Sequence, residues 1–301
     1  MARTGYMGVM ESLLWFRHSR DFLANFLVHQ RGGRNNMFKK TLAAALFATV
    51  CANADAALSP GDIALIGWID NGTPDSFAFV TLASVDAGEV VYFTDGGWTG
   101  TQFRSASAGD GDGYENLLQW TANANIAAGT IVRSTDTGAA SWAWTKSGPI
   151  PGTTSGNFAD LSLAQSGDQI YAFQGSSNNP LNNPSGHLFL LDDTGAFESA
   201  TNASTGDVPT GLTPGATAIA FNRNGSGQDF MGVSASVLAG SAKSRQQWLA
   251  TFADASNWSV GSAGTLPNGT IEIAAVPEPE TYALMLTGLG LVGWAARRRR
   301  T

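Results

Sequence analysis

Short apolar runs recur along the middle of the chain, and turn-forming residues separate them. The first run, Ile63 to Ile69, lies between Pro60-Gly61 and Asn71-Gly72, which is the pattern of a strand between two turns. About nine short strands separated by Gly, Asn, Asp and Ser loops predict a mainly β protein, folded as an antiparallel β-sandwich. The other segments with this pattern are Phe77–Leu82, Asp86–Thr94, Leu117–Thr121, Ala127–Val132, Gln169–Phe173, His187–Asp192, Thr213–Phe221 and Thr270–Ala274.

Three of these segments begin with the same turn chemistry. Ala87-Gly88, Ala128-Gly129 and Pro214-Gly215 each place glycine where a type II turn requires a positive φ. The spacing between the copies is uneven, so the pattern indicates a recurrent turn and not a solenoid repeat.

Only one segment of the body favours a helix. Ser241–Ala253 contains good helix formers and places Trp248, Leu249 and Phe252 at helical spacing. We expect one short helix there, and we expect Trp258, which follows it, to pack back on the sheet.

The front of the chain carries the pattern of an export signal, starting at Met37. Met37-Phe-Lys-Lys is basic, Leu42–Cys51 is apolar, and Ala52–Ala57 offers small-x-small cleavage sites. We therefore expect a signal peptide at residues 37–57, read by the Sec export machinery and cleaved after Ala56 or Ala57. Residues 1–36 are interpreted as an extension before the true start codon; the alternative is a long basic region with an amphipathic helix around Glu11–His29.

The last stretch of the chain has three parts in a fixed order. Pro277-Glu278-Pro279 should stay extended and open to an enzyme, because proline fixes φ and biases the preceding residue away from a helix. Residues 282–296 carry no charge, and as a helix they would cover about 22 Å, which is less than the roughly 30 Å of a bilayer core. Such a single membrane helix spans only if the bilayer thins or its ends snorkel. The basic stop that follows consists of Arg297, Arg298, Arg299 and Arg300, which would hold that end in the cytoplasm.

This arrangement resembles the PEP-CTERM protein-sorting signal, at residues 276–301. The resemblance implies an exosortase as the processing partner, in Gram-negative bacteria that make exopolysaccharide. It also implies export across the inner membrane, a transient membrane anchor, and then residence in the cell envelope or outside the cell. The alternative is an ordinary tail anchor after a proline-rich linker.

The exported body, residues 58–275, is acidic and has no thiol. From Ala57 to Pro279 the chain has six basic residues against twenty Asp and Glu, a net charge of −14. Such a surface repels phosphate backbones, so the composition excludes nucleic-acid binding through a basic face. Cys51 is the only cysteine and lies in the predicted signal, so the mature chain has no disulfide and no cysteine catalysis.

The body is poor in catalytic groups. Its single histidine, His187, follows Ser185-Gly186 beside an apolar strand, where histidine is more often structural than a general base. The best carboxylate cluster is a glycine-rich loop that carries Asp110, Asp112 and Glu115, whose oxygens suit Ca²⁺. Their spacing is not that of an EF-hand, and a plain acidic loop is the alternative. We therefore expect no catalytic residues and no cofactor other than a weak candidate Ca²⁺ site.

Trp98, Trp142 and Trp144 lie in stretches flanked by Gly or Ser and are candidates for sugar contacts. Trp142 and Trp144 alternate in Ser141-Trp-Ala-Trp-Thr145, so both rings lie on one face of the predicted strand. Exposed indoles could stack on exopolysaccharide, although one face of a strand usually forms the core.

The body also resembles, more loosely, a lamin-tail-like or immunoglobulin-like secreted domain. The residues that carry this likeness are Gly61–Ala64, Phe77–Val80, Ala87-Gly88, Val91–Trp98 and Leu118–Thr121. Such modules are accessories without catalytic residues. The sequence therefore predicts a non-catalytic structural or adhesive matrix protein in a biofilm, with a carbohydrate- or Ca²⁺-binding module as the alternative and an extracellular hydrolase as a weaker one.

Overall fold

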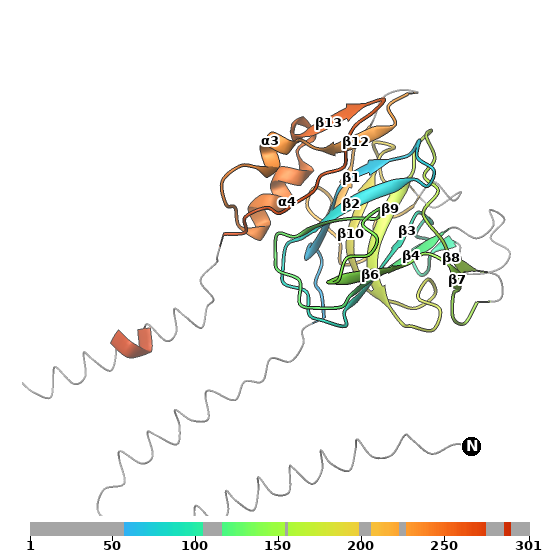
Figure 1. Cartoon of the computed structure of the whole chain (residues 1–301), viewed down its shortest axis with the longest axis horizontal. Helices are drawn as coiled ribbons and strands as arrows, with labels where there is room; N and C mark the ends of the chain where they lie inside the picture. The colour runs from blue at the N-terminus through green and yellow to red at the C-terminus, as the bar shows by residue number, and fades with distance from the viewer. Residues whose placement is uncertain are drawn as a thin grey trace, which may run out of the picture. The chain divides into compact units, whose positions relative to one another are not determined.

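The computed structural model describes residues 57–104, 116–153, 156–198, 206–222, 227–274 and 286–289. Except for Ala57, the predicted signal peptide and the extension before it lie outside these residues. The described body is mainly β, with two sheets and a short helical segment (Figure 1).

The smaller sheet has five strands, and all its pairings are antiparallel. Its strand order is β13 (Trp258–Gly261), β12 (Phe230–Val233), β1 (Ile63–Ile69), β2 (Ser76–Thr81) and β5 (Ile131–Arg133). Every residue of β2 and all but the last of β1 are buried, which explains why both strands have continuous apolar runs.

The larger sheet has eight strands and mixes the two pairing types. Strand β6 (Trp142–Thr145) pairs with β4 (Leu117–Ala122) beside the main path. Two pairs are parallel, β10 (Pro184–Asp192) with β11 (Ala218–Ala220) and β4 with β8 (Asn157–Phe158), so the prediction of a purely antiparallel sandwich is wrong at these two places. In order, the strands of the main path are β11 (Ala218–Ala220), β10 (Pro184–Asp192), β9 (Gln169–Gly175), β3 (Val90–Thr94), β4 (Leu117–Ala122), β8 (Asn157–Phe158) and β7 (Gly148–Pro149), and β6 is Trp142–Thr145.

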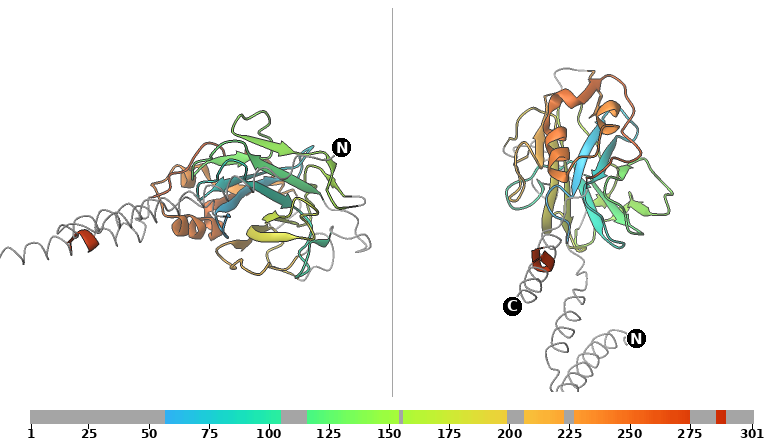
Figure 2. Two further views of the ribbon diagram at one scale, coloured as in Figure 1. Left: turned by 90° about the horizontal axis from the view of Figure 1, so that it is seen from below. Right: turned by 90° about the vertical axis from the view of Figure 1, so that its left-hand side faces the viewer.

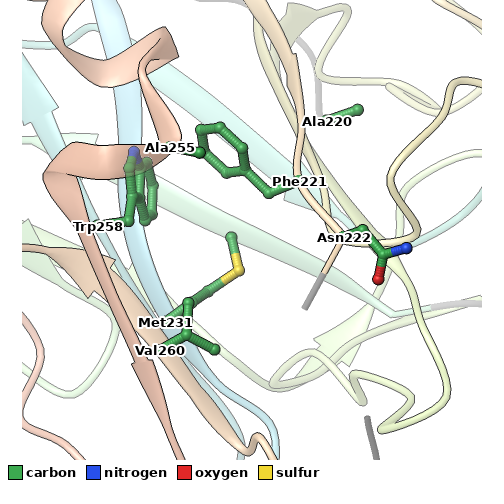
Figure 3. Close-up of a pocket in the computed structure, with 7 residues that line it drawn as sticks. All are labelled: Ala220, Phe221, Asn222, Met231, Ala255, Trp258 and Val260. Atoms are coloured by element: carbon green, nitrogen blue, oxygen red, sulfur yellow. The ribbon is translucent and has the colours of Figure 1, made fainter. Parts of the chain in front are cut away.

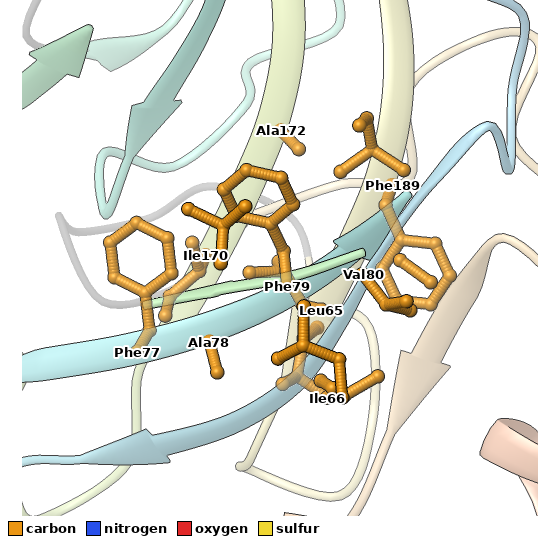
Figure 4. Packing of buried hydrophobic residues seen from close by; sticks show 14 of the residues in the cluster. Leu65, Ile66, Phe77, Ala78, Phe79, Val80, Ile170, Ala172 and Phe189 are labelled. Carbon is orange, nitrogen blue, oxygen red and sulfur yellow. The ribbon is translucent and has the colours of Figure 1, made fainter. Parts of the chain in front are cut away.

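An aromatic core joins the two sheets (Figure 4). Phe79 of β2 lies 5.1 Å from Phe93 of β3 and 5.3 Å from Trp120 of β4, measured between ring centroids. Phe77 lies 4.9 Å from Phe93 in the same layer. These contacts place the inner faces of the two sheets against each other, so the layered arrangement of the prediction is present.

The outer face of the larger sheet has an aromatic cluster of its own. Tyr92 of β3 and Phe173 of β9 belong to it, whereas their chain neighbours Phe93 and Ala172 point into the main core. This alternation follows from the two-residue period of a strand. Both faces of the larger sheet are therefore apolar around β3 and β9.

The helical segment lies beside the smaller sheet, as the orange ribbon next to the blue strands shows (Figure 2). It consists of α3 (Ala235–Leu238), α4 (Arg245–Ala253) and the 3₁₀ turn η2 (Ala255–Asn257). Helix α4 buries Trp248, Leu249 and Phe252. The prediction that the helix starts at Ser241 is wrong, because Ser244 caps the helix and forms a capping box with Gln247.

The predicted strand at Thr270–Ala274 forms only isolated bridges. Thr270 pairs with Thr130, and Ile273 pairs with Lys243. The segment changes partner between these two contacts, which prevents a continuous ladder.

The predicted glycine turns are confirmed by their backbone angles. Gly88, Gly129 and Gly215 have φ values of 95°, 90° and 75°. A side chain at Gly88 would meet nothing within 4 Å, whereas one at Gly129 would overlap the carbonyl oxygen of Ile271.

These two glycines give a matched pair of variants. We expect Gly88→Ala to lower the free energy of unfolding by about 1–2 kcal/mol, the cost of a left-handed alanine. Gly129→Ala should cost about 1–3 kcal/mol more, because the overlap with Ile271 is added to that strain. Urea unfolding measures both, and equal losses would contradict the contact with Ile271.

Candidate functional site

The body ends in a segment that we call the C-terminal strap, residues 266–274. Leu266 and Ile271 are buried. The Ile271 amide donates to the Gly129 carbonyl at 2.8 Å, and the Ile131 amide donates to the Gly269 carbonyl at 3.1 Å. These contacts fix the strap along the end of β5 and the turn before it.

The strap finishes on the residues that begin α4. The Ala274 amide donates to the Lys243 carbonyl at 2.8 Å. Two donors meet the Glu272 carbonyl: the Lys243 amide at 3.3 Å and the indole nitrogen of Trp248 at 3.0 Å. Ala274 is therefore fixed to the body through its backbone.

The first residues of the body meet the same helix start. Arg245 donates to the carbonyl oxygens of Pro60 and Gly61, and its guanidinium lies 3.1 Å from an Asp62 carboxylate oxygen. The Gly61 amide also donates to the Leu188 carbonyl at 2.8 Å. We call the residues 59–62, 242–247 and 272–274 the α4 corner, because both ends of the body meet there.

The predicted sorting residues Pro277, Glu278 and Pro279 and the arginines 297–300 lie outside the described residues. Of the predicted membrane helix, the structure describes only residues 286–289, which are helical, with Leu286 66% and Leu289 62% exposed. No helix within the described ranges has the length and apolar character that crossing a membrane requires.

Residues 275–300 match the family model described as the PEP-CTERM protein-sorting motif. The chain carries a PEP-CTERM sorting motif. This motif supports an exported protein that an exosortase processes, with membrane-anchored sorting before it reaches the envelope or the exterior. No curated protein and no solved structure matches the chain, so neither the lamin-tail-like likeness nor the immunoglobulin-like form of the sandwich is confirmed.

In the body that precedes this motif, Trp142 and Trp144 both face the core side of β6. Trp142 pairs with Ala122 of β4, and Trp144 pairs with Trp120 of β4. Trp144 lies 5.8 Å from the Phe93 ring, and both tryptophans are half-buried against the main core. The alternation predicted one shared face, and that face packs inward; the role in sugar stacking stays a prediction.

The acidic loop with Asp110, Asp112 and Glu115 lies outside the described residues. Across the described ranges, no group of three His, Cys, Asp or Glu side chains is placed to hold a metal ion. The loop's flank is fixed by Asp95, which accepts from the Asn116 amide at 3.2 Å and the Ser162 amide at 2.8 Å.

His187 lies within the outer aromatic cluster. Its ring centroid is 4.6 Å from Trp98 and 5.9 Å from Phe103, and its Nδ1 is buried with no hydrogen-bond partner among the described residues. Burial lowers the pKa of His187 to about 4. The imidazole is therefore neutral at neutral pH and packs as an aromatic side chain.

Sequence reasoning missed an apolar groove between the open edges of the two sheets (Figure 3). It has a volume of about 240 Å³ and is lined by side chains that include Phe221, Met231, Trp258 and Val260. The Phe221 and Trp258 rings lie 5.0 Å apart. The two rings come from residues 37 positions apart in the sequence, so no local pattern brings them together.

Proposed function

We propose that the protein is a non-catalytic component of the cell envelope or extracellular matrix, with a structural or adhesive role, which an exosortase sorts through Pro277-Glu278-Pro279. The observation that carries the proposal is the sorting motif, which starts directly after a folded, acidic, thiol-free β body. The Sec machinery would export the chain, and the inner membrane would hold it only until processing. The proposal includes no cofactor.

The hydrogen bonds of two buried carboxylates, Asp168 and Asp192, support a structural role for the body. Asp168 accepts from the Ala164 amide at 2.7 Å and the Gln169 amide at 2.9 Å. Asp192 accepts from both the amide and the hydroxyl of Thr194, at 2.8 and 2.6 Å. These oxygens complete turns between strands, which is a role in folding.

The test is processing of the full chain in a host with and without an exosortase. We expect the wild-type chain to lose the arginine tail only in the exosortase-positive host, and the variant Pro277→Ala/Glu278→Ala/Pro279→Ala to keep it there. The physical reason is that alanine removes both fixed φ angles and allows the segment to join the predicted membrane helix. Intact mass of the membrane-bound and released protein measures the outcome.

The control replaces Arg133 by alanine, which leaves the motif unchanged and should leave processing unchanged. Tail loss by the triple-alanine variant at the wild-type rate would overturn the sorting role of the motif.

A further inference from the structure

The α4 corner is where both ends of the body leave the fold, and this observation extends the proposed function. Arg245 fixes Pro60 and Gly61, while Lys243, two residues before it, fixes Ala274. The predicted signal cleavage and the sorting motif therefore both lie within a few residues of one corner.

The chain between the corner and the motif is very short. Only Ala275 and Val276 separate Ala274 from Pro277. Fully extended, the three steps from Ala274 to Pro277 cover at most about 10 Å. A protein that binds Pro277-Glu278-Pro279 as an extended segment therefore also meets the surface around Ala274.

The corner differs in charge from the rest of the acidic body. Arg245 is paired with Asp62, and the Lys243 ammonium lies 4.1 Å from the centre of the Trp248 ring, with Glu272 exposed beside it. Two cations and two carboxylates balance at this place, whereas the segment from Ala57 to Pro279 as a whole has a net charge of −14. The corner can thus approach another surface with little of the repulsion that the whole body produces.

We propose that the α4 corner is a docking surface for the exosortase, which contacts the folded body while it handles the motif. The surface combines the exposed, uncharged side chains at the helix start, Ala242, Gln246 and Gln247, with the balanced charges described above. The small side chain of Ala242 and the balanced charges allow the close approach that the short connection demands. The inference rests on the proposed function and adds a second contact to the motif.

The test compares two exposed alanines changed to tryptophan in the full chain, in an exosortase-positive host. Ala242 lies in the α4 corner, beside the start of β1, whereas Ala263 lies near the end of β1. Ala263 follows Gly261, the last residue of β13, and Gly261 is connected through its partner Phe230 on β12 to Ile69, the last residue of β1. Six residue steps along β1 separate the two ends by about 20 Å. We expect Ala242→Trp to slow loss of the arginine tail about tenfold, equivalent to about 1.4 kcal/mol, and Ala263→Trp to leave the rate unchanged.

A spacer separates docking from damage to the fold. About ten Gly and Ser residues inserted between Ala274 and Ala275 add roughly 17 Å of average reach, so the enzyme can bind the motif without contacting the corner. The spacer should therefore slow the parent chain as well, and in spacer chains Ala242→Trp should be processed at the same rate as its parent. A wild-type rate for Ala242→Trp, equal slowing in Ala263→Trp, or a tenfold difference that persists in the spacer chains would each overturn the docking surface while the wild-type chain is still processed. Failure of the wild-type chain to be processed would instead overturn the proposed function, and this inference with it.

Discussion

Phe79→Ala is expected to lower the free energy of unfolding by about 3–5 kcal/mol. The Phe79 ring is fully buried and lies within 6.5 Å of three other rings, at 5.1 Å from Phe93, 5.3 Å from Trp120 and 6.3 Å from Trp144. Its removal leaves a cavity between two sheets whose strands are held in register and cannot collapse freely. For a body of this size the loss corresponds to roughly 10 °C in Tm, which thermal unfolding of the chain from Ala57 to Ala274 measures.

Phe79→Leu is the matched control, because it keeps an apolar side chain at the same site. We expect it to recover a large part of the loss. If Phe79→Ala destabilised the body no more than Phe79→Leu, the ring would not be a member of the inter-sheet core.

The second large effect is a pair of opposed pH dependences at His187 and Asp192. Burial lowers the pKa of His187 to about 4 and raises the pKa of Asp192 to about 6. Each of these pKa shifts changes the free energy of unfolding by about 3 kcal/mol over the pH range between the ordinary pKa and the shifted one. The two act over nearly the same pH range.

The signs follow from which state binds more protons. Between pH 6.5 and 4 the unfolded chain protonates His187 and the folded chain does not, so this residue makes stability fall as the pH falls. Between pH 3.8 and 6 the folded chain keeps Asp192 protonated and the unfolded chain does not, so this residue makes stability fall as the pH rises. The two contributions cancel to a large extent in the wild-type protein.

Single variants should expose each contribution. Measured by urea unfolding from pH 4 to 6.5, the stability of His187→Phe relative to wild type should fall with rising pH, and that of Asp192→Asn should increase. Burial also raises the pKa of Asp75, which acts in the same direction as Asp192 and is common to all the variants. The double variant should track the wild type, and parallel curves for both single variants would contradict the opposed shifts.

Local patterns in the sequence predict most of the strands that carry the core. The apolar run Ile63 to Ile69 became β1 with the same bounds, because the turns on both sides of it stop the strand. Gly88 and Gly129 have the positive φ that their turns require. The alternation in Trp142 and Trp144 correctly indicated one shared, inward face.

Features that depend on distant partners were not predictable in the same way. Strand β12 (Phe230–Val233) contains Gly232 and is short, and it exists because β1 and β13 pair with its two edges. The parallel pairing of β11 with β10 depends on the path of the chain between them, and the sequence of neither strand indicates that path. The sorting motif was predictable because its parts are contiguous, whereas the contacts of Lys243 and Arg245 with the two ends of the body join residues up to 185 positions apart.

Because both ends of the body meet at the start of one helix, the body is suited to domain insertion and circular permutation. A domain whose N- and C-termini are neighbours can be inserted into a surface loop of another protein without stretching either chain. Its termini can also be joined by a short linker, and the chain can then be opened at another loop. In an envelope where proteins are assembled from exchanged modules, such a body could pass between different carriers and keep its fold.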